Sequence, residues 1–521
     1  MTTIQPTRAF LPAWLSVIVV VLFAGLFDTL FWDRELGINL SIFIVLVVGF
    51  HVQRVGWKGL SGPARSTLLG TVLAGVMVYV HHSAVAMVAA VIALGVSSAL
   101  AQESRLRSLF YAAAQMVSNF VMVPFGALGK IDELALSRGV PRSGWRWVKL
   151  SVLPTLVLLL FMQLYRAGNP KFDHLTAGFM DGLWEVMGDL LSEIFTAHTF
   201  FFLFALVLCG GLLFRFAPHL VVQMEQGLSD ALMRARVRRP HWMSPRAMDP
   251  LERERRMGVI LLIAVNVLLA VVNAIDINWV WVGFEVPEGF SLKQFVHEGT
   301  WMLIISILLS ILLLMHLFRK NQNFYSKGRS LKMLGLLWIV QNFILGVSVF
   351  LRNYHYISFH GLAYKRIGVI VFLVLVLVGL VTLFVKVRDK KSLFYLARLN
   401  AWAAFAVLIS LATVDWDSLI VRYNLGHWNQ GEIDVDNYLT MSDKVLPLLY
   451  ADMDRVEAQM EQHRHNEVRW VDHLDPAQFR RELDAKRDRF RWRCQRQHWQ
   501  EVNLADRKTM AALEEGPTER Q

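Results

Sequence analysis

The chain has 521 residues, of which 55% are hydrophobic and 12% aromatic, and its formal net charge is +11. Apolar residues at this density, gathered in runs near bilayer length, exclude an ordinary soluble protein. Its two cysteines, Cys209 and Cys494, form no C-x-x-C pair, which argues against a disulfide framework or a zinc cluster. We therefore expect an all-α, multi-span membrane protein whose main partner is the lipid bilayer.

The positive charge lies mainly in a few loops between apolar runs, whereas residues 415–521 carry 21 acidic and 16 basic side chains. Lys and Arg clustered in loops on one side of the membrane are how the positive-inside bias appears in a sequence. We therefore assign the basicity to membrane topology and expect no nucleic-acid binding.

Apolar runs long enough to cross a bilayer recur along the chain. The first has the length of a span and is followed by no good small-x-small cleavage site, which indicates a retained signal anchor. Eleven spans are predicted, at residues 13–32, 37–53, 66–82, 83–101, 147–166, 197–216, 257–276, 292–318, 332–351, 367–387 and 395–414.

A twelfth apolar stretch, residues 108–128, is long enough to span the membrane. Whether it does so decides on which side the basic loops lie. If it crossed, the basic residues at 130–149 would lie opposite those at 105–107, and every later basic loop would change sides. We therefore predict an interfacial or re-entrant helix, with the N-terminus in the cytoplasm and the C-terminus outside. Arg352, Lys365 and Arg366 are the exception, because they fall in an outer loop.

Two domains are predicted: a transmembrane bundle over residues 1–414, with a possible boundary near 130–146, and a small soluble helical domain over residues 415–521. The second domain should begin with three short amphipathic helices before residue 450 and end in a disordered stretch from Glu514. Residues 169–194 have apolar side chains at helical spacing, which predicts an amphipathic helix on the membrane surface or packed on the bundle.

Polar residues recur at helical spacing on three consecutive predicted spans, continued by Asn266 and Ser348. They either line one outward-facing cavity or hold the helices together through interhelical hydrogen bonds. Ser291 and Gln294 also form a capping box, which predicts a helix start near residue 291. The candidate binding residues on these stripes and in the following outer loop are Asn273, Asp276, Gln294, His297, Glu298, Gln341, Arg352, His355 and His360.

A metal site is the sharper interpretation of the same residues, because zinc accepts imidazole and carboxylate ligands. No H-x-x-x-H spacing supports it, and His297-Glu298 is half of the zinc-protease pattern, since position 301 is Trp. We therefore expect no metal. Phosphate loops, nucleophile elbows and Rossmann glycines are absent from the sequence, so we expect neither a catalytic residue nor a cofactor.

Four segments carry a family resemblance: residues 277–289 (INWVWVGFEVPEG), 295–300 (FVHEGT), 361–368 (GLAYKRIG) and 416–424 (WDSLIVRYN). They resemble bacterial membrane proteins of domain-of-unknown-function family 4173, close to family 4153. The resemblance covers roughly residues 150–450. It implies a multi-pass protein of the bacterial inner membrane with no assigned activity, and hence no catalytic residue.

Together these features favour a non-enzymatic membrane protein that binds or transports a small solute, an ion or a lipid. One alternative is an envelope sensor or scaffold whose bundle anchors the C-terminal domain. Another is a membrane enzyme that acts on lipid-linked substrates. The sequence identifies no protein partner.

Overall fold

The computed structural model describes residues 12–137, 196–234, 250–282, 292–427, 435–465 and 474–515, with scattered positions between 151 and 182. Within these ranges the chain is helical and contains no β-strand, apart from one isolated bridge between Ala231 and Lys391. The predicted all-α class is therefore confirmed.

Nine helices in the described ranges are long and apolar enough to cross a membrane, which indicates a multi-pass membrane protein. They are α1 (Ala13–Phe31), α2 (Ile38–Val55), α3 (Gly62–His81), α4 (Ala84–Gln102), α5 (Leu109–Ser137), α10 (Pro250–Asp276), α12 (Arg329–His360), α13 (Tyr364–Asp389) and α14 (Leu393–Ala412). Two further helices, α8 (Ala197–Leu213) and α11 (Leu292–Leu317), have shorter apolar stretches.

Every predicted span except residues 147–166 coincides with one of these helices. That span and the amphipathic helix predicted at residues 169–194 fall largely outside the described residues. The number of spans that cross the membrane, and their orientation, stay predictions.

One compact unit comprises residues 1–72, 94–105 and 112–221, and its polar contacts converge on the last carbonyl groups of α8. His51 of α2 lies 3.0 Å through its Nε2 atom from the carbonyl oxygen of Leu212. Gln102 at the end of α4 donates to the carbonyls of Gly211 and Leu212, at 2.9 and 2.7 Å. Asn119 of α5 donates to Gly211 as well, at 2.6 Å. The last carbonyl groups of a helix have no backbone N–H donor within the helix, and these side chains supply the missing hydrogen bonds.

The packing of α5 bears on the stretch predicted to lie at the interface. A Cβ atom added to Gly211 would lie 2.4 Å from the ring of Phe120, and one added to Gly126 would lie 2.4 Å from the ring of Phe216. These contacts pack α5 against the end of α8 and the residues that follow it. By length and composition α5 could cross a membrane, so the interfacial or re-entrant placement of residues 108–128 stays a prediction.

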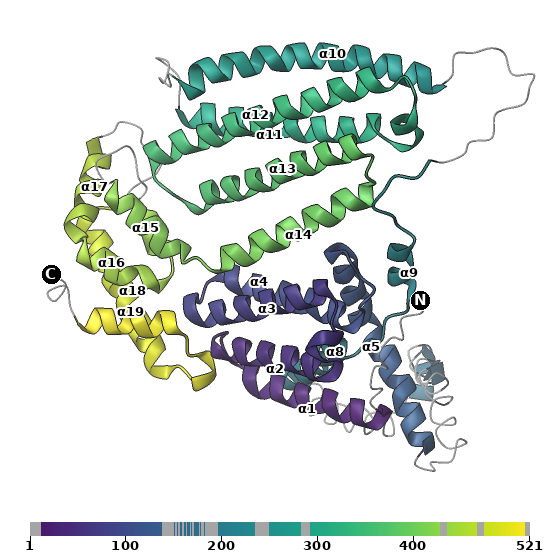
Figure 1. Ribbon diagram of the computed structural model, residues 1–521. Coiled ribbons are helices and arrows are strands. Elements are labelled where there is room, and N and C mark those ends of the chain that lie inside the picture. The colour runs from purple at the N-terminus through teal and green to yellow at the C-terminus, as the bar shows by residue number, and fades with distance from the viewer. Residues whose placement is uncertain are drawn as a thin grey trace, which may run out of the picture. The chain divides into compact units, whose positions relative to one another are not determined.

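The second compact unit comprises residues 73–93, 106–111 and 222–521. In it α10, α12, α13 and α14 lie side by side in that order, and α11 packs against α12 (Figure 1). Glycines allow close approach between these helices. A Cβ atom on Gly335 would lie 2.6 Å from the ring of Phe318, and one on Gly346 would lie 2.8 Å from Leu377.

Short turns connect α12, α13 and α14, which makes consecutive helices antiparallel neighbours. The first turn depends on Gly361, whose φ of 79° is a left-handed conformation that favours glycine. Arg366 donates to the carbonyl of His360 at 2.7 Å and also to that of Gly361, so it satisfies the last carbonyl groups of α12. In the second turn, the side chain of Ser392 caps α14 by accepting from the Tyr395 amide at 3.1 Å.

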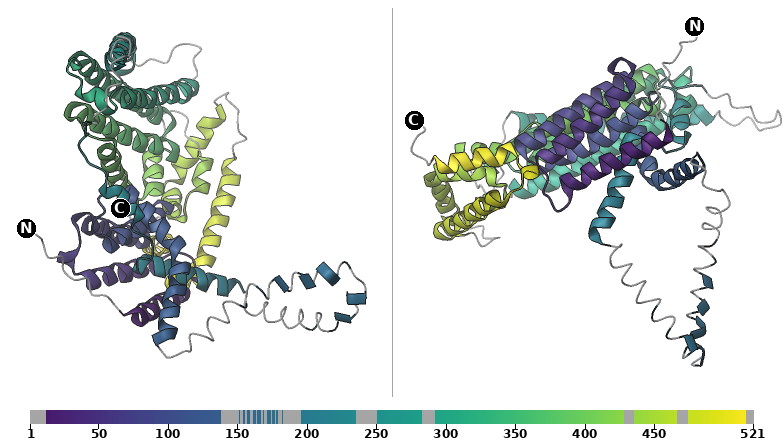
Figure 2. Two further views of the ribbon diagram at one scale, coloured as in Figure 1. Left: turned by 90° about the vertical axis from the view of Figure 1, so that its right-hand side faces the viewer. Right: turned by 90° about the horizontal axis from the view of Figure 1, so that it is seen from below.

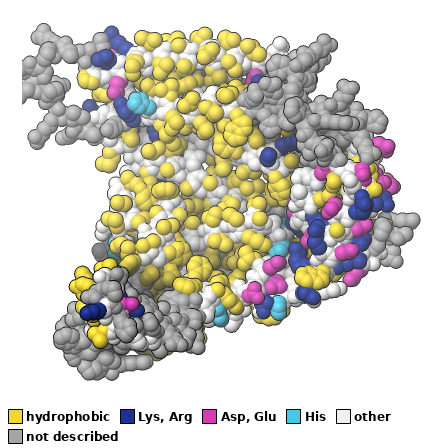
Figure 3. Space-filling view, turned by 180° about the vertical axis from the view of Figure 1, so that it is seen from behind, with side chains coloured by type: hydrophobic (Ala, Val, Ile, Leu, Met, Phe, Trp, Pro, Cys, Tyr) yellow, Lys and Arg dark blue, Asp and Glu magenta, His cyan; other side chains and the backbone are white. Residues whose placement is uncertain are grey.

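The C-terminal helices are α15 (Trp416–Gly426), α16 (Leu446–Ala451), α17 (Met453–His465), α18 (Pro476–Arg496) and α19 (Leu504–Glu514). They gather beyond the ends of α12 and α13 where one turns into the other, as Figure 1 and the right-hand view of Figure 2 show. Their core of Tyr438, Leu446, Phe479 and Phe490 also includes Ile367 of α13. On the face shown in Figure 3, charged side chains gather over these helices, whereas hydrophobic side chains cover the long ones.

The start of this region differs in detail from the prediction of three amphipathic helices. The chain forms α15 and α16, with two short 3-10 turns at Asp436–Thr440 and Asp443–Val445 between them. The sequence predicts a disordered end from Glu514, but Glu514 is the last residue of α19, and residues 516–521 lie outside the described residues. The domain boundary at residue 414 stays a prediction.

Candidate functional site

The predicted polar stripes of α10 and α12 face each other. Gln341 donates from Nε2 to the Asn266 side-chain oxygen at 2.9 Å, and Asn273 donates to the Gln341 carbonyl at 3.1 Å. Further along, Arg352 forms an ion pair with Asp276. Since both helices run in the same direction, residues 266–276 match residues 341–352. We call this set the polar seam; its members are Asn266, Asn273, Asp276, Gln341, Ser348 and Arg352.

A π-helical turn, Ile277–Trp281, extends the polar seam directly after Asp276. Turns of this kind are rare and often occur at functional positions. Here the Trp281 ring nitrogen donates to Ser348 Oγ at 2.9 Å, and His355 Nε2 lies 3.2 Å from the carbonyl oxygen of Val280. The turn therefore ties the end of α10 to α12.

The ion pair of the polar seam is buried on both sides. Asp276 is 3% exposed and Arg352 is 7% exposed. Charged side chains within a bundle are costly unless they are paired, so the pair makes this arrangement tolerable. Three buried oxygens of the polar seam nevertheless have no hydrogen-bond partner among the described residues: Asp276 Oδ2, Asn273 Oδ1 and Gln341 Oε1.

The remaining candidate residues are not among the described contacts of the polar seam. His360 lies at the end of α12 with its ring 4.4 Å from that of Tyr356, away from the contacts of the polar seam. The helix that carries Gln294, His297 and Glu298 begins at Leu292, next to the predicted start, but these three side chains lie outside the described part of the chain. Within that described part, no three His, Cys, Asp or Glu side chains are grouped to hold a metal ion.

A second polar centre lies where the C-terminal helices meet α13, and the sequence analysis missed it. Asp417 is its buried acceptor: Tyr364 donates to Oδ1 at 2.6 Å, and Ser442 donates to Oδ2. Lys444 Nζ lies 3.7 Å from Asp417 Oδ2 and 2.9 Å from Asp415 Oδ1. One lysine is therefore shared by two carboxylates.

The same lysine reaches the end of α3. Lys444 Nζ donates to the carbonyl of His81 at 2.9 Å, and His81 Nε2 lies 3.0 Å from the carbonyl of Thr413. Asn424 exchanges two hydrogen bonds with the backbone of Leu362, at 2.6 and 3.0 Å. We call this centre the joint; its members are His81, Tyr364, Asp415, Asp417, Asn424, Ser442 and Lys444.

The electrostatics of the joint agree with this geometry. Burial alone would raise the pKa of Asp415, but the Lys444 ammonium group and the Ser418 hydroxyl outweigh it, so the pKa of Asp415 lies below its ordinary value. The ionised carboxylate is thus the favoured form in the folded chain.

Residues 68–451 match a family described as a domain of unknown function. The chain belongs to the family DUF4153. The kinship expected from the four sequence segments is therefore confirmed. No curated protein and no solved structure matches the chain.

The DUF4153 match includes the polar seam and the joint and ends with the last residue of α16. Two segments that carry the resemblance, residues 361–368 and 416–424, contact each other through Tyr364 with Asp417 and Leu362 with Asn424. Polar residues within these two segments were the available signal for the joint. The sequence alone gave no reason to pair them across more than 50 residues.

Proposed function

We propose that this DUF4153 protein is a non-enzymatic membrane scaffold whose helical bundle holds the C-terminal helices in a fixed position at one membrane surface. The joint is the observation that carries the proposal. It connects three separate stretches of the bundle to the C-terminal helices through a buried Asp417 and a Lys444 whose side chain is 7% exposed.

The chemistry of the joint suits a permanent connection. A buried lysine is stabilised only when nearby acceptors replace its water, and Lys444 has two carboxylates and one carbonyl within reach. Opening the joint would separate these charges. The shared hydrophobic core around Ile367 adds a non-polar connection at the same end of α13.

The polar seam supports the same proposal. Its amide and charged side chains bond from helix to helix, and such bonds commonly contribute about 1 kcal/mol or less each in membrane bundles. They would align α10 with α12 and so keep the support of the C-terminal helices stiff.

A complementation experiment tests the proposal. Cells that lack this protein would receive the full chain, a chain ending at residue 427, or the Lys444→Met variant, and the phenotype of the deletion would be scored. We expect both altered chains to fail, whereas Lys365→Met, which removes an exposed lysine at the same end of α13, should restore function. Full restoration by the chain ending at residue 427 would contradict the proposal.

A second candidate function, binding or transport of a small solute, ion or lipid, is favoured by the three unpartnered oxygens of the polar seam. Asp276 would then bind the ligand or couple to a proton, because ionisable residues in bundles often mark such pathways. Purified full-length protein in liposomes would be compared with the charge-neutral double variant Asp276→Asn, Arg352→Gln. Unchanged uptake, export and ligand-induced thermal stabilisation would exclude this role for the polar seam.

A further inference from the structure

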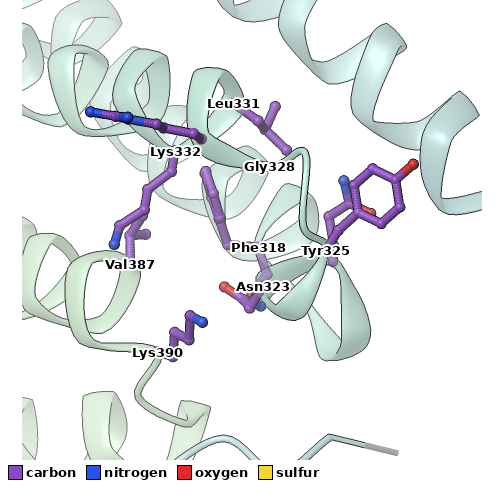
Figure 4. Close-up of a pocket in the computed structure, with 10 residues that line it drawn as sticks. Phe318, Asn323, Tyr325, Gly328, Leu331, Lys332, Val387 and Lys390 are labelled. Atoms are coloured by element: carbon purple, nitrogen blue, oxygen red, sulfur yellow. The ribbon is translucent and has the colours of Figure 1, made fainter. Parts of the chain in front are cut away.

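A cavity of about 260 Å³ lies at the opposite end of α12 and α13 from the joint. It is enclosed by the end of α11, the short turn Lys320–Phe324, the first turn of α12 and the end of α13. Figure 4 shows Lys332 on α12 and Lys390 at the end of α13, with Phe318 beside Lys332. We call it the basic pocket; its lining includes Phe318, Gln322, Gly328, Arg329, Lys332 and Lys390.

The charge of the basic pocket is unbalanced. Three of its lining residues are cationic, and none is Asp or Glu. Lys332 donates to the backbone carbonyl of Arg388 at 2.8 Å, and Lys390 lies 5.2 Å from the ring centre of Phe324. Neither contact supplies a negative charge.

Two carboxylates near the basic pocket are paired with arginines that do not line it. Asp389 pairs with Arg388 at 2.9 Å, and Glu252 pairs with Arg255 at 2.7 Å. The Tyr325 hydroxyl also points to Glu252, to which it donates at 2.9 Å. Asp389 also interacts electrostatically with Lys332, whereas Arg329 and Lys390 form no ion pair with any carboxylate of the described residues. Positive charge of the pocket therefore remains for a bound anion.

The backbone reinforces this potential. The 32-residue helix α12 begins at the basic pocket, and its N-cap residue, Gly328, offers no side chain to accept from the first-turn amides. Such amides and the helix dipole favour anions at a helix N-terminus. The position is also tight, because a Cβ atom on Gly328 would lie 3.0 Å from the carbonyl oxygen of Tyr325.

A buried side chain points independently to a ligand. Gln322 is 5% exposed and lines the basic pocket, yet neither its side-chain oxygen nor its nitrogen has a hydrogen-bond partner among the described residues. Leaving such a group without a hydrogen-bond partner destabilises the folded chain. A bound group with both acceptor and donor oxygens would satisfy the amide.

We propose that the basic pocket binds a phosphate-bearing anion, either the phosphate of an anionic lipid headgroup or a free phosphate compound. The three cations favour an anion, and the α12 amides and Gln322 can form hydrogen bonds with its oxygen atoms. The volume of the cavity suits a ligand the size of a lipid headgroup. The loops around it are those predicted to face the cytoplasm, where basic pockets between helices bind anionic headgroups. This site lies apart from the joint and goes beyond the proposed scaffold function.

Ligand titrations of the purified full-length protein test the proposal. The chain in neutral detergent would be titrated with phosphatidylglycerol, phosphatidylcholine or inorganic phosphate, and the apparent Kd would be obtained from the thermal midpoint. The test variant is Arg329→Gln, Lys332→Gln, Lys390→Gln. The control, Lys58→Gln, Arg65→Gln, Lys327→Gln, removes three exposed cations that do not line the basic pocket.

We expect the test variant to bind phosphatidylglycerol about tenfold or more weakly, because charge-assisted hydrogen bonds are lost, and the control to stay within about twofold of the parent chain. Gln322→Leu should weaken binding while keeping all three cations. Competition by inorganic phosphate would identify a free phosphate compound as the ligand source, and its absence would identify the lipid headgroup. Equal affinities of test variant and control, or equal stabilisation by phosphatidylcholine, would overturn the proposal.

Discussion

The two ends of the bundle formed by α10 to α14 differ in how their charges are matched. At the end that carries the joint, Lys444 is shared by two carboxylates, and the nearby Arg352 is paired with Asp276. At the other end, Arg329, Lys332 and Lys390 surround a cavity that no carboxylate lines. At the first end the cations pair with carboxylates of the same chain, whereas at the second end they are available to bind a ligand.

The comparison also accounts for two of the three cations that depart from the charge rule for topology, while the third, Lys365, is exposed. Arg352 and Arg366 lie at the end predicted to face outward, where cations are disfavoured in short loops. Arg352 is buried in an ion pair, and Arg366 donates to the last carbonyls of α12. Both side chains make structural contacts within the folded chain, so we do not count them among the loop cations that set the topology.

The largest expected effect comes from breaking the buried pair of the polar seam. Arg352→Met should lower the free energy of unfolding by about 3–5 kcal/mol, because it leaves the Asp276 carboxylate buried without its cation. Arg329→Met, an exposed arginine at the basic pocket, should change it by about 0.5 kcal/mol or less in the absence of an anion. Equal losses in the two variants, measured by reversible denaturation in detergent, would remove the distinction between the two ends.

Acid should loosen the joint before it affects the basic pocket. Because the pKa of Asp415 is lower in the folded chain than in the unfolded chain, the carboxylate stabilises the fold above its unfolded pKa. This contribution is lost as the pH falls below about 4 and through the folded pKa. The change in thermal midpoint between pH 6 and pH 3 should therefore shrink in Asp415→Asn.

Burial raises the pKa of Asp443 in the same region, so that residue contributes the opposite slope with pH. The difference between Asp415→Asn and the parent chain isolates the joint from it. An identical pH profile in the two chains would show that Asp415 does not stabilise the joint.

The smallest effect within the polar seam is expected from its neutral part. Gln341→Leu removes the hydrogen bond to Asn266 and should lower the free energy of unfolding by about 0.6 kcal/mol. Gln341→Glu is the companion variant, since it would place a carboxylate among the unpartnered oxygens. A loss of more than about 2 kcal/mol in Gln341→Leu would indicate that the bond does more than align two helices.

The sequence predicted which residues share a helix face but not which faces meet. Helical spacing selected Asn273, Asp276, Gln341 and Arg352, and the structure brings these four together across α10 and α12. Interhelical pairing depends on how the bundle packs, which the spacing along one helix does not encode.

Contacts made by turns and chain ends were harder to predict. Lys444 and Asp417 lie 27 positions apart on segments of different local structure, so no periodic pattern links them. Of the cations of the basic pocket, Arg329 and Lys390 lie in loops between the predicted spans, whereas Lys332 begins the predicted span 332–351. Their convergence depends on the backbone of two turns. Polar residues within the family-resembling segments were the clearest available signal for the joint.

A distance measurement between spin labels tests most directly whether the joint fixes the C-terminal helices. Labels on Lys327→Cys and Arg489→Cys, with Cys209 and Cys494 replaced by Ala, would report across the bundle in full-length protein by pulsed electron resonance. We predict one narrow distance distribution that broadens in Lys444→Met and stays narrow in Lys365→Met. A broad distribution in the chain with an intact joint would contradict the scaffold account.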